Sequence, residues 1–148
     1  TEQECGNGKN DWEYCCYAWS LMKHYILNGA SAYQYWNISL DKGGYSRWGW
    51  QQNSLITVDP GKRTYRFNHE YYLLKHVSHF VMPGARLVRT QGSFSELLAF
   101  VNPDKSVVVV IRNEEKSVRK ITVRIDDRSF QADLDPDSFH TFLLPCSK

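Results

Sequence analysis

The sequence predicts an α/β region followed by an all-β region, on two observations. In residues 1–84, apolar side chains recur first at helical spacing and then in a largely aromatic run that includes Tyr33, Tyr35 and Trp36. Such an alternation of helix and buried strand is typical of α/β folds. In residues 85–148 the hydrophobic period falls to two, and turn residues separate a series of short strands. We therefore expect two domains, an α/β domain and a small antiparallel β-sandwich, that meet at Pro83–Gly84.

The first predicted helix begins at a capping box formed by Asn10 and Glu13 and ends at a glycine C-cap, Asn28–Gly29. Its buried stripe consists of Trp12, Cys15, Cys16, Trp19, Met22 and Ile26. Residues 30–37 follow as a strand that is too uniformly apolar and aromatic to have a wet face. This pattern is expected of a parallel strand that is covered on both sides.

A second helix is predicted after a short extended run, Ser54–Val58, which stops at Asp59–Pro60–Gly61. Asn68 is the expected N-cap of this helix, and Phe67 is expected to pack on Tyr72 as a hydrophobic staple. The buried stripe would be Leu73, Val77, Phe80 and Val81, with Pro83–Gly84 ending the helix.

Six strands are predicted in the second region: 86–90, 96–101, 107–113, 118–125, 129–134 and 139–144. Residues Ile121, Val123 and Ile125 alternate with polar neighbours, as in a strand with one wet face. Most phenylalanines of this region occupy inward-alternating positions, which favours a core role (Phe94, Phe100, Phe130, Phe139 and Phe142).

Charge and composition exclude several functions. The formal net charge is only +2, and Lys and Arg form no block, so we expect no nucleic-acid partner. No window approaches the apolar length of a membrane span. His76 and His79 lack a third ligand with recognisable spacing, so we predict no metal and no cofactor. The four cysteines (Cys5, Cys15, Cys16 and Cys146) show no paired zinc spacing, and their disulfide state stays open.

Three large aromatics, Tyr45, Trp48 and Trp50, lie on a glycine-punctuated loop after Asp41–Gly44. Tyr and Trp combine a flat apolar face with a polar edge, so they suit ligands that are amphipathic rings, of which sugars are the commonest. The alternative is that these side chains only pack beneath the loop. Spacing alone does not separate the two interpretations.

The chain begins at Thr1–Glu2 without an initiator Met, which suggests a fragment whose upstream part has been removed. We expect the whole protein to be secreted or periplasmic. If a strand precedes the chain start, Glu2 lies where a barrel strand ends and its loop begins, the usual place of catalytic groups in an α/β barrel. Without such a strand, a Glu at this position is a solvated end charge.

A resemblance covers nearly the whole chain. Its elements, in order, are Thr1–Glu2, Asp11–Trp12–Glu13–Tyr14, Tyr35–Trp36–Asn37 with Leu40, Gly43–Gly44, Trp48–Gly49–Trp50, Ile56–Thr57–Val58–Asp59, Tyr71 to Phe80 and Pro83–Gly84–Ala85–Arg86. No single one is specific, but their order and register resemble the C-terminal part of the glucosylceramidase-like enzymes, family 30 of the glycoside hydrolases. The strands 107–111 and 138–143 resemble the side β domain of that family.

The resemblance implies the last βα units of a (β/α)8 barrel joined to a β-sandwich, and a retaining β-glycosidase. Glu2 matches the nucleophile at the end of the seventh barrel strand, whereas Glu4 matches no catalytic position. Trp36 and Asn37 match the end of the eighth strand, where the family lines its sugar pocket. For Trp48 and Trp50 the resemblance implies only a general role as pocket wall.

The resemblance also implies that the acid/base carboxylate lies upstream of this chain, in an Asn–Glu pair, so the isolated chain should be inactive. The expected partners are the rest of the barrel and a β-linked glucoside or glucan. A glucosylceramidase, a β-glucosidase and a β-1,6-glucanase all remain open, and the sequence after Trp36 disfavours a glucuronoxylanase. The alternative function is a non-catalytic carbohydrate-binding β-sandwich module, which requires a strip of exposed aromatics after Ala85.

Overall fold

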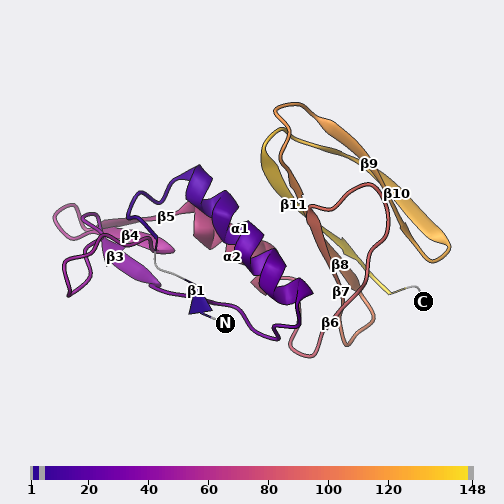
Figure 1. The fold of residues 1–148 in the computed structure, drawn as a ribbon, viewed down its shortest axis with the longest axis horizontal. Helices are drawn as coiled ribbons and strands as arrows, with labels where there is room; N and C mark the ends of the chain where they lie inside the picture. The colour runs from indigo at the N-terminus through magenta and orange to yellow at the C-terminus, as the bar shows by residue number, and fades with distance from the viewer. Residues whose placement is uncertain (1, 4–5, 147–148) are drawn as a thin grey trace. The chain divides into compact units, whose positions relative to one another are not determined.

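The computed structural model describes residues 2–3 and 6–146, and the side chains from residue 6 onward. The chain divides into two compact units, Thr1–Lys75 and His76–Lys148 (Figure 1). The second unit is an antiparallel β-sandwich, as the sequence predicts.

Helix α1, Trp12–Leu27, has a different N-cap from the predicted one. The side chain of Asp11 accepts a hydrogen bond from the Tyr14 backbone N–H at 2.9 Å, whereas Asn10 has a φ of 51° and lies outside the helix. The capping box of Asn10 and Glu13 is therefore wrong. Aspartate is as good an N-cap as asparagine, and the Asn10 side chain instead accepts a hydrogen bond from the Ser54 N–H.

The predicted end of α1 at Asn28–Gly29 is confirmed. Gly29 has a φ of 96°, its N–H donates to the Ile26 carbonyl, and the Ala30 N–H donates to the Tyr25 carbonyl. These two bonds make a Schellman motif, in which a glycine in the left-handed region ends the helix.

Strand β2 is shorter and more exposed than the sequence suggests. Only Gln34–Tyr35 form the strand, and the residues of the predicted 30–37 run are exposed or half-buried. The expectation of a fully covered strand is wrong for this chain. β2 pairs in parallel with β1, Glu2–Gln3, on one side, and the described residues supply no strand for its other side.

A three-stranded sheet follows, in the order β3–β4–β5. β3 (Ser39–Asp41) is parallel to β4 (Ile56–Asp59), and β4 forms an antiparallel hairpin with β5 (Thr64–Phe67). The sequence pattern predicts β4, whereas β5 is not predicted. The turn between them is the predicted one at Asp59, whose side chain accepts a hydrogen bond from the Lys62 N–H at 3.2 Å.

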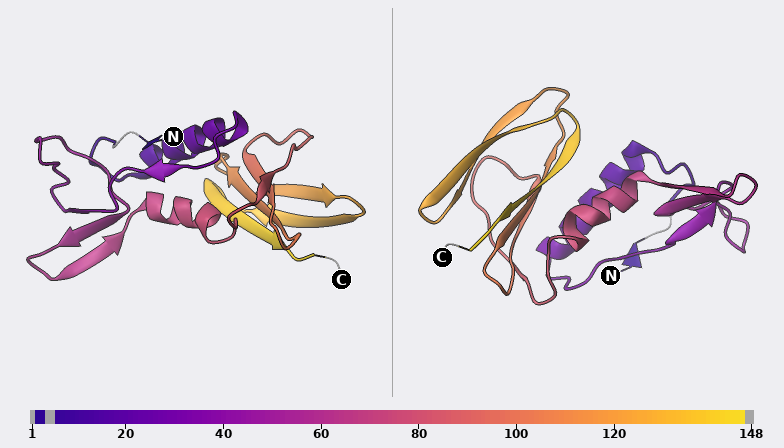
Figure 2. Two further views of the ribbon diagram at one scale, coloured as in Figure 1. Left: turned by 90° about the horizontal axis from the view of Figure 1, so that it is seen from below. Right: turned by 180° about the vertical axis from the view of Figure 1, so that it is seen from behind.

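Helix α2, His69–Ser78, lies beside α1 (Figure 2), and Trp12 meets His69 edge to face at 5.5 Å. Phe67 packs on the first turn of α2 as predicted, but its closest ring is Tyr71, stacked at 4.0 Å, and Tyr72 lies at 6.3 Å. Asn68 precedes the helix, although its side chain binds Ser54 and Thr57 of the neighbouring segment.

Helix α2 ends at Ser78, before the predicted stop at Pro83–Gly84. The side chain of Asn102, which is 2% exposed, binds the backbone beyond the helix. Its Nδ2 donates to the Phe80 carbonyl at 3.0 Å and its Oδ1 accepts from the Met82 N–H at 2.9 Å. A buried amide therefore replaces the hydrogen bonds that a longer helix would make.

The second unit contains the six predicted strands. A four-stranded antiparallel sheet has the order β11–β8–β7–β6, and a hairpin joins β9 to β10. The strands are β6 (Arg86–Leu87), β7 (Leu97–Val101), β8 (Val107–Asn113), β9 (Arg119–Ile125), β10 (Arg128–Leu134) and β11 (Ser138–Leu144). Figure 1 shows the β9–β10 hairpin, in orange, facing the four-stranded sheet.

The core of the second unit lies between these two layers. Ala99, Val109, Ile111 and Leu134 are buried at its centre. Side chains packed around them include Phe94, Phe142 and the inward-facing side of β9, namely Ile121, Val123 and Ile125. The predicted alternation along β9 and the predicted core role of these two phenylalanines are confirmed.

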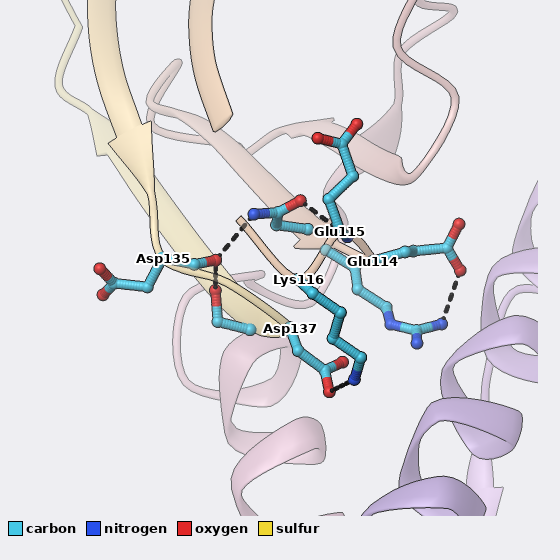
Figure 3. A network of polar contacts seen from close by, with 8 residues as sticks. Glu114, Glu115, Lys116, Asp135 and Asp137 are labelled. Atoms are coloured by element: carbon cyan, nitrogen blue, oxygen red, sulfur yellow. Dashed lines mark hydrogen bonds and ion pairs between the residues drawn. The ribbon is translucent and has the colours of Figure 1, made fainter. Parts of the chain in front are cut away.

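Polar contacts join the turn after β8 to the turn before β11 (Figure 3). The buried Asn113 side chain donates to the carbonyls of Ser117, at 2.9 Å, and Asp135, at 2.8 Å. The Asp137 N–H donates to the Glu115 carbonyl, and Lys116 pairs with the Asp137 carboxylate at 2.7 Å. One buried amide thus ties together two turns that are distant in sequence.

Candidate functional site

The two strands that carry the predicted catalytic and sugar-binding residues lie side by side. β1 and β2 pair in parallel, with Glu2 opposite Gln34 and Gln3 opposite Tyr35. Parallel neighbours present their carboxyl ends at the same edge, so the backbone of Glu2 and the segment beginning at Trp36 share one edge. The Glu2 side chain and the whole of Glu4 lie outside the described part of the chain.

Trp36 and Asn37 directly follow β2. The Trp36 side chain is 43% exposed, whereas Asn37 is half-buried and has a φ of 63°. The Asn37 Nδ2 donates to the Gln52 Oε1 at 3.1 Å and to the Asn53 carbonyl at 3.2 Å. Asparagine adopts the left-handed region more readily than most non-glycine residues, and these two hydrogen bonds hold its side chain in place.

The aromatic loop, residues 45–51, displays its tryptophans to solvent. Ser46 fixes the loop, because its Oγ accepts hydrogen bonds from the N–H groups of Trp48 and Trp50. The two indoles stack at 5.9 Å with planes 30° apart, and they are 58% and 60% exposed. Packing beneath the loop therefore does not account for these side chains, and a flat apolar platform faces outward.

The centre of the first unit is an amide that the sequence analysis misses. Asn53 is fully buried, and its Oδ1 accepts hydrogen bonds from the backbone N–H groups of Gly8, at 2.7 Å, and Asn10, at 3.4 Å. Its Nδ2 donates to the Glu70 Oε1 at 2.8 Å. One side chain, two residues beyond the aromatic loop, therefore joins the segment after β1 to helix α2. We call Asn53 and Glu70 the buried amide–carboxyl pair.

Two titratable groups meet here, the buried Glu70 and the half-buried Tyr35 of β2. Burial raises the pKa of Glu70 above its ordinary value, against the hydrogen bond from Asn53, which lowers it. Burial and then the neighbouring Glu70 carboxylate raise the pKa of Tyr35. The Glu70 Oε2 and the Tyr35 hydroxyl are close, but neither makes a hydrogen bond of ordinary geometry with a described residue.

Little in the sequence could have revealed this pair. The run Gln51–Ser54 reads as a polar loop, yet Gln52, Asn53 and Ser54 are buried. The available signal was Gly6–Asn7–Gly8. A Cβ on Gly6 would lie 2.7 Å from the Asn53 Cγ, so the glycine marks a close approach of the backbone to another segment.

A polar hollow of about 400 Å³ lies in the first unit. Gly8 and Asn10 line it together with Lys42, Asp59 and Arg66. Lys42 and Asp59 approach each other at 3.7 Å. None of Trp36, Asn37, Trp48 and Trp50 lines this hollow, so the described residues do not gather the predicted sugar-binding side chains into one cavity.

The described residues contain no cluster of three or more His, Cys, Asp or Glu side chains that could hold a metal ion. Among them, no helix has both the length and the hydropathy that crossing a membrane requires. In the second unit, the exposed large hydrophobic side chains are aliphatic (Met82, Leu87, Val88, Val118 and Leu143). The exposed aromatic strip that a carbohydrate-binding module requires is therefore not found on the described part of this unit.

Comparison with known proteins identifies related chains. Residues 84–142 match the glycosyl hydrolase family 30 β-sandwich domain. The lysosomal acid glucosylceramidase of Mus musculus is 29% identical over 123 residues, which are 80% of this chain and 24% of that protein. The chain thus spans about a quarter of that relative.

Solved structures show the same fold over almost the whole chain. SrfJ of Salmonella typhimurium superposes with a TM-score of 0.86 and 26% identity, covering 99% of this chain and 34% of that one. An endo-β1,6-glucanase superposes with a TM-score of 0.84 and 24% identity, covering 99% of this chain and 35% of that one. The catalytic domain of a family 30 xylanase from Talaromyces cellulolyticus superposes with a TM-score of 0.73 and 19% identity, covering 99% of this chain and 37% of that one.

Proposed function

We propose that this chain, which belongs to the C-terminal part of glycosyl hydrolase family 30, contributes the nucleophile and part of the sugar pocket of a retaining β-glycosidase. In this proposal the first unit completes a (β/α)8 barrel whose other strands lie outside the chain. The sandwich is the side domain of that barrel. Activity belongs to the whole protein, and the isolated 148 residues are expected to hydrolyse nothing measurable.

One observation carries the proposal: the parallel, in-register pairing of β1 with β2. In a (β/α)8 barrel the reacting groups are found at the carboxyl ends of the strands. The pairing gives the strand bearing Glu2 and the strand leading to Trp36 and Asn37 the same direction. The exposed Trp48–Trp50 platform follows in the next loop and offers a flat apolar surface for a sugar ring.

A retaining mechanism gives Glu2 a definite task. Its carboxylate attacks the anomeric carbon while a second carboxyl, roughly 5 to 5.5 Å away, protonates the departing glycosidic oxygen. Water then cleaves the glycosyl–enzyme ester, and the second group accepts the water's proton. In this chain Asn113–Glu114 matches the acid/base pair in letters only, because Glu114 is exposed and binds Arg112 at 2.8 Å. The acid/base is therefore proposed to lie upstream.

The proposed substrate is a β-linked glucoside or glucan. The glucosylceramidase relative acts on a glucosyl lipid by its name, and one structural neighbour is an endo-β1,6-glucanase. A soluble β-glucoside, glucosylceramide and β-1,6-glucan are thus the substrates to compare, with β-1,4-xylan as the negative case. We further propose that the whole protein is secreted or periplasmic.

The test is nucleophile removal and chemical rescue in the full-length protein. Glu2→Ala should lower kcat by a factor on the order of 10⁴ to 10⁶, as removal of a covalent nucleophile does elsewhere. Azide should restore turnover, because it fits the vacated space and attacks the same anomeric carbon. The azide product should have the α configuration by NMR, since one displacement inverts the centre. The matched control Glu4→Ala should keep its activity, and near-normal turnover of Glu2→Ala would refute the assignment.

A further inference from the structure

The buried amide–carboxyl pair has no part in the chemistry proposed above, yet it contacts the segments that surround it. We propose that Asn53 and Glu70 are positioning residues of this glycosidase. They fix two segments relative to each other, namely residues 6–10, which follow the nucleophile strand, and the loop that contains Asn37. The inference rests on the proposed function for its catalytic consequence.

The geometry makes Asn53 a single junction for three segments. Its side-chain oxygen accepts from Gly8 and Asn10, its side-chain nitrogen donates to Glu70, and its backbone carbonyl accepts from the Asn37 side chain. Segment 6–10 follows β1, and Asn37 follows β2. Both ends of the predicted catalytic edge are therefore tied to the same residue.

The segment needs such a junction because it has little structure of its own. Residues 6–10 form neither helix nor strand, and Gly6 and Gly8 have φ values of 78° and 81°. Fixing the backbone of a glycine costs more conformational entropy than fixing that of any other residue. The two hydrogen bonds to Asn53 and the bond from the Ser54 N–H to the Asn10 side chain fix the segment.

Glu70 determines which way the amide of Asn53 points. The two N–H donors of segment 6–10 require an oxygen on their side, and the carboxyl oxygen of Glu70 requires a donor on the other. All of these groups are buried or part-buried, so water does not substitute for either partner. The pair is complementary in one orientation only.

Exchanging the two functional groups tests the pair. Asn53→Asp keeps the oxygen for Gly8 and Asn10 but places a second carboxyl against Glu70. Asn53→Asp combined with Glu70→Gln restores the hydrogen bond with its direction reversed, at the same charge and nearly the same volume. Glu70→Gln alone keeps an acceptor for Asn53 and should be close to wild type.

In the full-length protein, Asn53→Asp should lower kcat by about 10²-fold, the size expected when reacting groups are misplaced by about 1 Å. KM should change much less. The loss should grow as pH rises, because two adjacent carboxyls share a proton at low pH and repel when both ionise. The double variant should recover kcat to within about threefold and lose this pH dependence.

Asn113→Asp is the matched control, because it also alters a fully buried amide but lies in the second unit. It should lower the melting temperature without lowering kcat. If Asn53→Asp lowers the melting temperature as Asn113→Asp does while kcat stays normal, the pair is only structural and the proposal is overturned. Failure of the double variant to recover kcat would overturn it as well.

Hydrogen exchange of residues 6–10 provides a measurement that does not depend on turnover. Exchange should be faster in Asn53→Asp and return to the wild-type rate in the double variant. If the wild-type protein hydrolyses no β-glucoside, the proposed function fails, but this exchange pattern would still support the positioning of the segment. Unchanged exchange in Asn53→Asp would overturn it whatever the activity.

Discussion

Both units have an apolar core, but among the described residues the first unit buries more polar side chains than the second. In the second unit, apolar side chains on alternate positions of β7, β8 and β9 meet in one core. In the first unit, the loops are held by buried polar side chains, namely Gln52, Asn53, Ser54, Asn68 and Glu70. Apolar packing decides which face of a strand is buried, whereas hydrogen bonds also fix direction and distance. The unit with the predicted catalytic edge is thus the one that relies more on directional contacts.

The largest expected effect is in the sandwich core. Leu134 is fully buried beside Val109 and Ile111, so Leu134→Ala should lower the free energy of opening of this unit by about 2 to 5 kcal/mol. Leu143→Ala, on β11 and 52% exposed, should change it by less than about 0.5 kcal/mol. Hydrogen exchange of the β8 amides in the full-length protein measures both. Equal losses would mean that the sandwich is not organised around this core.

A smaller effect is expected in the first unit, from Gly6→Ala. The positive φ of Gly6 alone should cost about 1 to 3 kcal/mol, and the new Cβ would collide with Asn53. Gly29→Ala is the control, because Gly29 has a φ of 96° but its added Cβ would meet no atom within 4 Å. Thermal unfolding of the full-length protein should show a larger loss for Gly6. Equal losses of stability would mean that the Asn53 side chain moves away from the new Cβ without a cost in free energy.

The smallest effect concerns pH and Glu70. Because burial raises the pKa of Glu70 in the folded state, the folded protein binds the Glu70 proton more tightly than the unfolded chain does. The stabilisation from this proton is complete below the ordinary pKa of 4.5 and is lost as pH rises through the folded pKa. Wild type should therefore lose stability relative to Glu70→Gln as pH rises from about 4.5 through the raised folded pKa. Urea unfolding measures the difference, and parallel curves would contradict the raised pKa.

These contrasts explain what sequence reasoning could predict. The strands β8, β9, β10 and β11 match their predicted ranges to within one residue at each end, because a period of two and turn residues are local signals. The helix α1 and its glycine C-cap are predicted for the same reason.

The remaining features depend on partners that are distant in sequence. The Asn10 side chain binds Ser54 and so leaves the helix cap to Asp11. The buried amide of Asn102 ends α2 early, and Asn53 reaches both Gly8 and Glu70. No periodic pattern distinguishes a buried asparagine from one in a solvated loop. For the candidate site, the sequence therefore indicates the loop that carries Trp48 and Trp50, but not Asn53 and Glu70, the buried residues that hold the neighbouring segments.

The order of strands in the four-stranded sheet also has a consequence during translation. β8 pairs with β7, which precedes it, and with β11, which is made only after the β9–β10 hairpin. At about 5 to 20 residues per second, the residues between Asn113 and Ser138 take roughly one to five seconds to synthesise. During this time the edge of β8, with its buried Val108–Ile111 run, has no partner strand.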